Sequence, residues 1–230
     1  MSNELTVTTP EQTAVTAPEQ TTEVAATDAK NVINYNPVFP TMFASITLDL
    51  PVEDMAQDLL LLASDTENYE GGYTSLYNRQ SISHIRGHKE LEEAIYGITN
   101  SYLREMKYEV NPQKCNIMMW ANVMRLGGHQ RSATRPHSQI AGEFFIKCDE
   151  KSVPIIFENP TNPLRMHDPM VMRPEDFTPF TAPTMTIQPK PNMLMLWPSW
   201  VSHFVPKITG ESSVPRVSIA FTVDFLPPGV

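Results

Sequence analysis

The residues best suited to chemistry are histidines and an arginine in the C-terminal half of the chain. They are His129 and His137 in GGHQRSATRPHS (127–138), His203 in LWPSWVSHFVP (196–206) and Arg216 in PRVSIAFTVDF (215–225). Neutral imidazole binds divalent metals, and a guanidinium binds a carboxylate through paired N–H groups. The sequence therefore contains parts of a metal site and of an anion site, if the fold brings these segments together.

Length and composition predict one folded domain. The chain has 230 residues, of which 41% are hydrophobic, enough for one sizeable core. Its net charge of -9 and pI of about 5.1 argue against direct binding to nucleic acid or to anionic lipid. The start has no signal-peptide pattern, and no apolar stretch is long enough to span a membrane. We expect Cys115 and Cys148 to be buried, reduced thiols of a cytosolic protein.

The N-terminal residues have a different composition from the rest of the chain. Residues 1–30 contain no aromatic side chain, and TTPEQT at 8–13 recurs as TAPEQT at 16–21. So little apolar surface cannot offset the entropy lost on ordering, which predicts a disordered, low-complexity arm followed by a folded domain over 31–230. Either the arm is only a solvated leader, or it orders by lying along a neighbouring subunit.

The first half of the folded domain contains two helix signals. A strand pattern in NPVFPTMFASITLDL precedes PVEDMAQDLLLLAS, where Pro51 and two following acids indicate a helix start. The segment GHKELEEAIYGITNSYLREMKY has apolar residues every three or four positions, which predicts a long helix packed on a sheet.

From residue 115 onward the apolar period changes to two. Short runs separated by Pro, Gly, Asn and Asp indicate antiparallel strands. In the run 216–225, one face is apolar and the other carries Arg216, Ser218 and Asp224, which predicts one core face and one polar face. We therefore expect a mostly β fold with packed N-terminal helices: a double-stranded β-helix, or cupin-like jelly roll, whose interior mouth can hold a small ligand.

An ordered series of motifs carries a family resemblance. The motifs are VFPTMF, WANVMRLGG, PHSQIAGEFFI, IIFENP, LWPSWVSHFVP and PRVSIAFTVDF, over roughly residues 36–226. Together they resemble the iron(II)/2-oxoglutarate oxygenases that are common in tailed phages and marine bacteria. The resemblance implies a facial triad of iron ligands with His203 as the distal one, and it implies that Arg216 and Ser218 hold the 2-oxoglutarate carboxylate.

The chain departs from this family at the first two metal ligands. The family pattern runs Gly-Gly, a Gln or Asn, then His-x-His-Pro, and here its ligand positions fall on Ala133 and Arg135. Alanine has no donor atom, and a guanidinium is a permanent cation with only N–H groups. Arg135 is a candidate to fill the metal position with its own charge. His129 and His137 are possible replacement ligands, but His137 lies four residues past the first position, roughly 10 Å or more along an extended chain.

From the sequence alone, His203 and Arg216 each have two interpretations. His203 is either a metal ligand or a packed histidine beside Trp197 and Trp200, and Arg216 either binds an anion or pairs with Glu143 or Asp224. The Pro-rich segment 159–183 is expected at the surface, as a lid or a docking loop. The histidines His84, His88 and His167 are also expected at the surface.

The interpretation we favour is a catalytically degenerate, non-enzymatic protein without a cofactor. It would serve as a structural component of a phage virion, assembled in the host cytoplasm. The N-terminal arm and the Pro-rich loop would contact other virion subunits in a homo-oligomer. One alternative is an active hydroxylase that uses iron(II) and 2-oxoglutarate, with His203 and a displaced ligand such as His137. Another is an iron-free module that binds a small carboxylate through Arg216.

Overall fold

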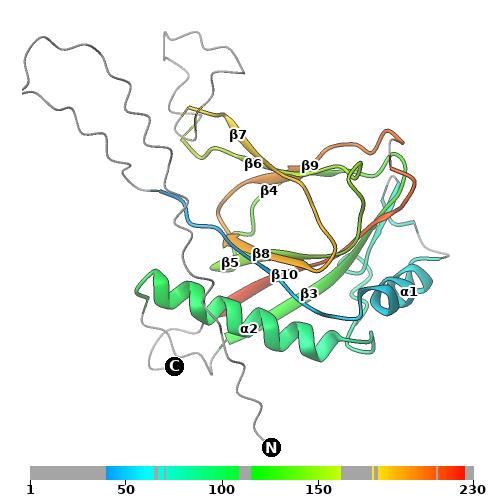
Figure 1. Cartoon of the computed structure of the whole chain (residues 1–230), viewed down its shortest axis with the longest axis horizontal. Helices are drawn as coiled ribbons and strands as arrows, with labels where there is room; N and C mark the ends of the chain where they lie inside the picture. Colours follow the sequence, from blue (N-terminus) through cyan, green and yellow to red (C-terminus); the bar gives the residue numbers. More distant parts are fainter. Residues whose placement is uncertain are drawn as a thin grey trace, which may run out of the picture. The chain divides into compact units, whose positions relative to one another are not determined.

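The computed structural model describes residues 40–64, 67–69, 71–108, 115–161, 178, 181–210 and 212–225 (Figure 1). The described residues from Thr41 onward form one compact unit. The predicted arm, its boundary at residue 30, His167 and most of the Pro-rich segment lie outside the described residues.

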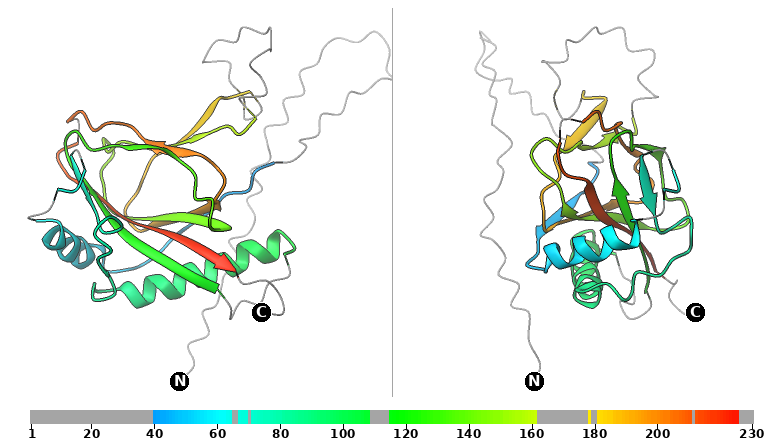
Figure 2. Two further views of the ribbon diagram at one scale, coloured as in Figure 1. Left: turned by 180° about the vertical axis from the view of Figure 1, so that it is seen from behind. Right: turned by 90° about the vertical axis from the view of Figure 1, so that its right-hand side faces the viewer.

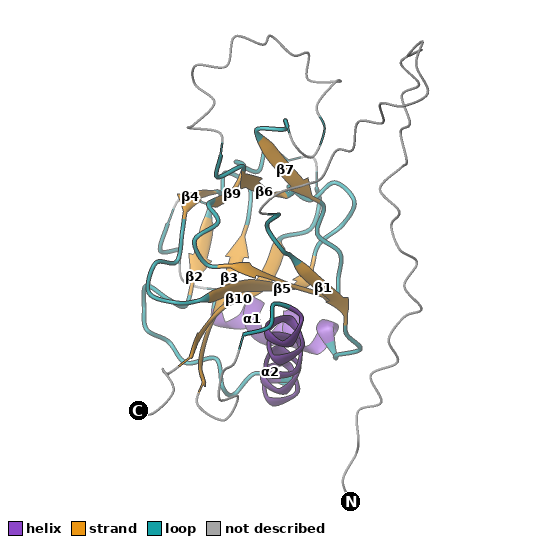
Figure 3. Cartoon of the chain, turned by 90° about the vertical axis from the view of Figure 1, so that its left-hand side faces the viewer, coloured by secondary structure: helices purple, strands orange, loops and turns teal. Residues whose placement is uncertain are grey.

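Two antiparallel sheets face each other and form the jelly roll that the sequence predicted (Figures 1 and 3). The six-stranded sheet has the order β1 (Ala44–Thr47), β8 (Met193–Pro198), β5 (Ile140–Lys147), β10 (Arg216–Phe225), β3 (Cys115–Met124) and β2 (Gly72–Thr74). The four-stranded sheet has the order β4 (Gln130–Ala133), β9 (His203–Val205), β6 (Ile155–Glu158) and β7 (Thr184–Ile187).

Both predicted helices are present and cover the outer face of the six-stranded sheet (Figures 2 and 3). Helix α1 spans Val52–Leu62, with Pro51 at its N-cap and two acids in the first turn, where the helix dipole favours negative charge. Helix α2 spans His88–Glu105 and buries the predicted stripe through residues such as Leu91 and Ile95. In the part of the chain that the structure describes, no helix is both long enough and apolar enough to cross a membrane.

The six-stranded sheet separates two hydrophobic clusters. The larger cluster joins the helices to the outer face of the sheet and contains Leu59, Leu91 and Ile219. The smaller one lies between the sheets and contains Phe145 of β5, Trp197 of β8 and Phe157 of β6. The space between the sheets is therefore lined by aromatic side chains on both walls.

Strand β10 has the two faces that the sequence predicted, one apolar and one polar. Its apolar face packs in the larger cluster as predicted, through Val217 and Ile219. Its polar face is not a solvent face, since Arg216, Ser218 and Thr222 are all buried. Alternation predicts which side chains share a face, but it does not reveal that a second sheet covers the polar one.

Both cysteines are free thiols, as expected. Cys115 opens β3 and Cys148 follows β5, and each is half-buried rather than fully buried. Burial raises the pKa of both thiols, and that of Cys148 rises to about 11.

Candidate functional site

The polar face of β10 is the floor of the candidate site. Residues paired across neighbouring strands project to the same side of a sheet. Ala220 pairs with Trp120 on β3 and with Glu143 on β5, while Arg216 pairs with Met124 at the end of β3. These side chains therefore share the inner face, opposite the four-stranded sheet.

Arg216 is the most deeply buried charged residue of this floor, with 1% of its side chain exposed. Its Nη1 donates to Oε1 of Glu143 at 3.0 Å, and the hydroxyl of Ser218 donates to the same oxygen at 2.6 Å. The guanidinium carbon lies 5.1 Å from the ring centroid of Phe145. The predicted ion pair is thus formed with Glu143, not with Asp224.

Half of the Arg216 fork has no partner. Its Nε and Nη2 are buried and form no hydrogen bond within the described residues. Buried guanidinium N–H groups normally bind an acceptor, because leaving them unpaired is unfavourable. The binding of a carboxylate by Arg216 and Ser218 stays a prediction, and the free edge of the fork is the feature that favours it.

Tyr69 is a member of the site that the sequence did not indicate. It precedes β2, and its ring lies directly over Gly72, where an added Cβ would be 2.2 Å from Cζ of the ring. Gly72 pairs with Met124, which pairs with Arg216, so the tyrosine lies above the same cross-strand row as the arginine. The hydroxyl is buried without a partner among the described residues. Burial raises the pKa of Tyr69 to about 12, although the charge of Arg216 opposes the shift.

His203 projects toward the floor from β9. It is 4% exposed, and its ring centroid lies 5.0 Å from that of Trp197 in an edge-to-face contact. Its Nδ1 lies 3.2 Å from the carbonyl oxygen of Val201, so the tautomer protonated on Nδ1 donates to that oxygen and leaves Nε2 unprotonated. Burial, and then the charge of Arg135, lower the pKa of His203. Trp200, the other expected neighbour, is 55% exposed.

Ala133 of β4 is the direct cross-strand partner of His203. Position 133, which the sequence pattern assigned to the first metal ligand, therefore pairs directly with His203, the assigned distal ligand. The side chain at position 133 is only a methyl group. A hydrogen-bonded cluster on Ser132, Ser202 and Glu158 fixes this register, because both serine hydroxyls donate to the same carboxylate oxygen. These bonds join β4 and the start of β9 to β6, and they lower the pKa of Glu158.

Arg135 enters the site just after β4. Its backbone N–H donates to the carbonyl oxygen of Ser199 at 2.9 Å, and its guanidinium carbon lies 5.4 Å from the ring centroid of Trp120. Burial lowers the pKa of Arg135, whereas the negative charge of Glu143 raises it. The cation thus lies over the floor, near enough to Glu143 and His203 for their charges to interact.

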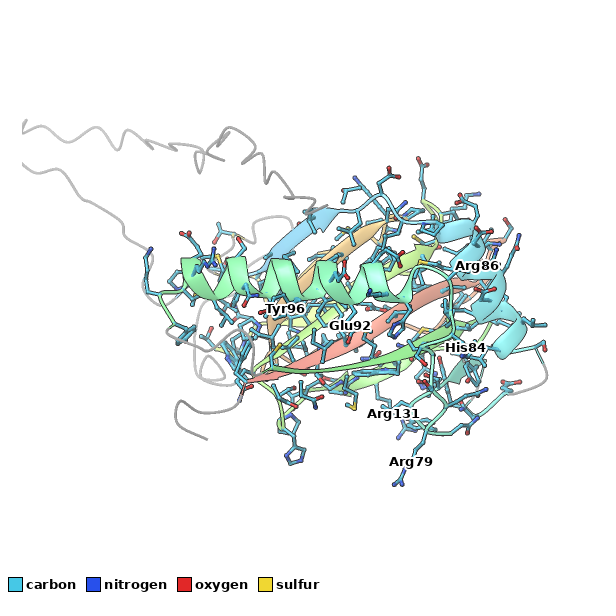
Figure 4. The ribbon with its side chains drawn as sticks, turned by 90° about the horizontal axis from the view of Figure 1, so that it is seen from below. Arg79, His84, Arg86, Glu92, Tyr96 and Arg131 are labelled. Atoms are coloured by element: carbon cyan, nitrogen blue, oxygen red, sulfur yellow. The ribbon has the colours of Figure 1, made fainter. Side chains whose placement is uncertain are left out.

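The remaining histidines are placed elsewhere. His137 lies exposed in the turn before β5. Burial raises the pKa of Asp224, and the nearby charge of His137 opposes that shift. His129 is half-buried, with Nδ1 3.4 Å from the carbonyl oxygen of Gly127. His84 is exposed, two residues before Arg86 in the chain (Figure 4). His88, expected at the surface, is half-buried at the start of α2.

The donor set does not fit an iron(II) ion. His203 has a suitable imidazole, but its neighbours at positions 133 and 135 are a methyl group and a cation. Across the ranges that the structure describes, no group of three or more His, Cys, Asp or Glu side chains could hold a metal.

Comparisons with known proteins agree with this architecture. Residues 118–222 match a family described as "Putative 2OG-Fe(II) oxygenase", and this range includes both His203 and Arg216. Among curated protein sequences, none matches the chain.

Several solved structures are similar to this chain at low sequence identity. A prolyl-4-hydroxylase from Pseudomonas putida aligns with a TM-score of 0.54 and 9% identity, over 81% of this chain and 94% of that one. The epimerase SnoN from nogalamycin biosynthesis aligns with a TM-score of 0.49 and 8% identity, over 83% of this chain and 80% of that one. EvdO2 from Micromonospora carbonacea var. aurantiaca, complexed with 2-oxoglutarate, aligns with a TM-score of 0.46 and 10% identity, over 83% of this chain and 89% of that one. The prolyl-4-hydroxylase likeness places this chain in the double-stranded β-helix fold of the 2OG oxygenases.

Proposed function

We propose that this chain is a catalytically degenerate protein with the fold of the 2OG-Fe(II) oxygenases. The observation that carries the proposal is the pairing of Ala133 with His203. Strands β4 and β9 bring the assigned ligand positions 133 and 203 together, and only position 203 carries a side chain with a donor atom. Arg135, the second assigned position, adds a positive charge, which repels a divalent cation.

An anaerobic titration of the full chain with iron(II) and 2-oxoglutarate tests this proposal. An assembled site produces a metal-to-ligand absorption band, and an active enzyme then forms succinate when oxygen is admitted. We expect neither a band nor succinate. A saturable band at one iron per chain, followed by oxygen-dependent succinate formation, would instead establish the active hydroxylase, with a displaced ligand such as His137.

We further propose that the chain is a structural component of a phage virion. This step is supported by the resemblance of its motifs to oxygenase-like sequences of tailed phages. It is also supported by the composition of residues 1–30, which suits an arm that ties neighbouring subunits together. Together with the Pro-rich segment 159–183, this arm would contact other subunits. Mass spectrometry of purified particles is the test, and particles that lack the protein would refute the virion role.

A second candidate function is iron-free binding of a small carboxylate. It is favoured by the two unpartnered nitrogens of Arg216, Nε and Nη2, which form one free edge of a buried guanidinium. A ligand that binds only the folded state stabilises it by RT ln(1 + [L]/Kd) and so raises the melting temperature. We therefore expect 2-oxoglutarate to stabilise the chain in the presence of a chelator. Absence of any such shift, with Arg216→Ala behaving like the wild type, would count against a carboxylate site.

A further inference from the structure

A groove lies between the free edges of the two sheets. Strand β1 is the last strand of the six-stranded sheet, and β7 is the last strand of the four-stranded sheet. Figure 3 shows both strands on the same side of the molecule, with β2 and β4 on the opposite side. The groove has a volume of about 520 Å³, and the residues that line it include Ser45, Thr47, Thr186, Gln188, Lys190 and Met193. None of the residues described above for the candidate site lines this groove.

Both edges present unpaired backbone groups to the groove. In an antiparallel pair, alternate residues bond to the neighbouring strand, and the residues between them direct their N–H and C=O groups outward. The N–H of Leu48 bonds across the β1–β8 ladder, so by alternation Ser45 and Thr47 are the outward residues of β1. The N–H of Asn159 bonds across the β6–β7 ladder, which makes Thr186 an outward residue of β7. Within the described residues, these outward groups form no backbone hydrogen bond.

The edges on the opposite side of the jelly roll are closed. On β2, Gly72 exchanges two backbone bonds with Tyr69, and the side chain of Asn68 bonds to both the N–H and the carbonyl oxygen of Thr74. On β4, a register shift interrupts the ladder with β9, and the exposed Arg131 adds a charge. Charges, bulges and covering loops keep sheet edges from pairing with other chains. The described strands β1 and β7 contain no charged residue, no proline and no register shift, so they are open to pairing.

An open edge of this kind binds an extended polypeptide, which adds a strand through main-chain hydrogen bonds. Each of the two edge strands has four residues, which limits the added strand to about the same length. Half-buried Ile187 and Met193 offer apolar contacts in the groove to alternate side chains of such a segment. Exposed Lys190 forms no ion pair within the described residues and favours an acidic neighbour. The groove therefore suits a short, alternating apolar segment with an acidic residue beside it.

We propose that this groove binds residues 4–8 of the N-terminal arm of a second copy of the chain. The segment reads Glu-Leu-Thr-Val-Thr, so apolar Leu5 and Val7 alternate with β-branched threonines after one acid, and Pro10 ends the run. The whole arm, residues 1–30, carries five acidic residues and one lysine, which complements Lys190. This inference rests on the proposed virion role, in which the arm connects neighbouring subunits.

The arm is long enough to reach a neighbour. The described residues begin at residue 40, four residues before β1, so the chain enters the folded domain next to a wall of the groove. Residues 9–39 connect the proposed segment to this point. A random-coil connection of about 30 residues has an end-to-end distance of roughly 30 Å, which is sufficient to pass from one subunit to an adjacent one. Each copy would give one arm and accept one, a head-to-tail contact that can be repeated over many subunits.

Sedimentation of the full chain over a range of concentrations tests the exchange. We expect the average mass to rise with concentration. Val7→Pro removes a backbone N–H from the added strand and should raise the concentration at half-association about tenfold. Val24→Pro makes the same substitution elsewhere in the arm, and this matched control should associate like the wild type. Lys190→Glu should weaken association about threefold, because an exposed ion pair contributes little.

A disulfide between two chains identifies the segment and its source. In a background with Cys115→Ser and Cys148→Ser, one protein carries Thr6→Cys and a second carries Thr186→Cys. When the two are mixed under mild oxidation, we expect a linked heterodimer to form faster than either protein forms a linked homodimer. Thr21→Cys in place of Thr6→Cys is the control, and it should form the heterodimer no faster than the homodimers.

Three results would overturn the arm exchange. The first is a full chain that stays monomeric at all concentrations. The second is a Val7→Pro variant that associates like the wild type, which would mean that the subunits meet through another surface. The third is a chain with cysteines at both positions 6 and 186 that closes only within itself, which would place the arm in its own groove.

The virion role is tested separately, by mass spectrometry of purified particles. Particles that contain the protein, together with wild-type association of Val7→Pro, would refute only the arm exchange. Particles that lack the protein, together with the expected heterodimer, would refute only the virion role.

Discussion

The guanidinium of Arg216 and the carboxylate of Glu143 form an ion pair at 3.0 Å, with side chains only 1% and 6% exposed. The two residues lie on neighbouring strands, β10 and β5, on the face that looks into the jelly roll. The pair neutralises one edge of the arginine and leaves the other edge free for an anion. It therefore links the stability of the six-stranded sheet to the proposed binding site.

Removing one partner of this pair should destabilise the protein more than removing both. Arg216→Met or Glu143→Leu alone leaves a buried unpaired charge, and we expect each to lower the free energy of unfolding by about 3–5 kcal/mol. The double variant contains no buried charge at this place and should lose clearly less than the sum of the two single variants. Urea denaturation of the four proteins measures this coupling. Additive losses would show that the two residues do not stabilise the fold as a pair.

Tyr69→Phe should leave the stability of the ligand-free protein unchanged or raise it slightly. The hydroxyl is buried without a partner among the described residues, so its removal eliminates an unfavourable desolvated group and keeps the ring over Gly72. Thermal unfolding without ligand should therefore match or exceed that of the wild type. A loss of about 1 kcal/mol or more would mean that the hydroxyl is already bonded in the free protein.

The sequence predicted those parts of the molecule that depend on local periodicity. Apolar spacing identified both helices, and alternation identified the two faces of β10. The motif spacing also placed Ala133 and His203 in one site, and the register of β4 with β9 makes them direct neighbours. In each case the pattern of side chains along one segment, or the order of motifs, contained the information.

The sequence could not reveal the contacts that depend on distant segments. Tyr69 lies between α1 and β2, and only the pairing of β2 with β3, and of β3 with β10, brings it to Arg216. Glu143 was one of two possible partners for Arg216 until the register of β5 placed it on the same face. The four-stranded sheet, which buries the polar face of β10, is likewise a feature of tertiary structure.

His203 should make the protein less stable below neutral pH. Burial lowers its pKa in the folded chain below the unfolded value of about 6.5, so the unfolded state binds a proton first as the pH falls. The free energy of unfolding should therefore decrease from pH 7.5 to 5.5, by at most about 1.4 kcal/mol per pH unit for this one group. His203→Gln should reduce that slope, whereas His84→Gln, at an exposed position, should not. Identical slopes in all three proteins would contradict the assignment.

Cys148 should react slowly with alkylating agents in the folded protein. Burial raises the pKa of its thiol to about 11, and only the thiolate is nucleophilic. In a Cys115→Ser background at pH 8, we expect iodoacetamide to label native Cys148 roughly a hundredfold more slowly than the same protein in urea. Mass spectrometry over time gives both rates. Equal rates would show that the thiol is accessible and ionised, contrary to its position after β5.

Ala133→His with Arg135→Asp should create an iron site where the wild type has none. Position 133 is the direct partner of His203, and position 135 lies just after β4, where the charge of Arg135 acts on His203. The double variant would offer two imidazoles and a carboxylate, the donor set of the facial triad that binds iron(II) and leaves positions open for 2-oxoglutarate.

The same anaerobic titration measures the gain. We expect a saturable absorption band in the double variant and none in Ala133→His alone, because the charge of Arg135 then still opposes the metal. Adding His203→Ala to the double variant should abolish the band. If the double variant binds no iron while remaining folded, positions 133 and 135 are not the metal positions of this fold. The explanation of catalytic loss through these two residues would then be wrong.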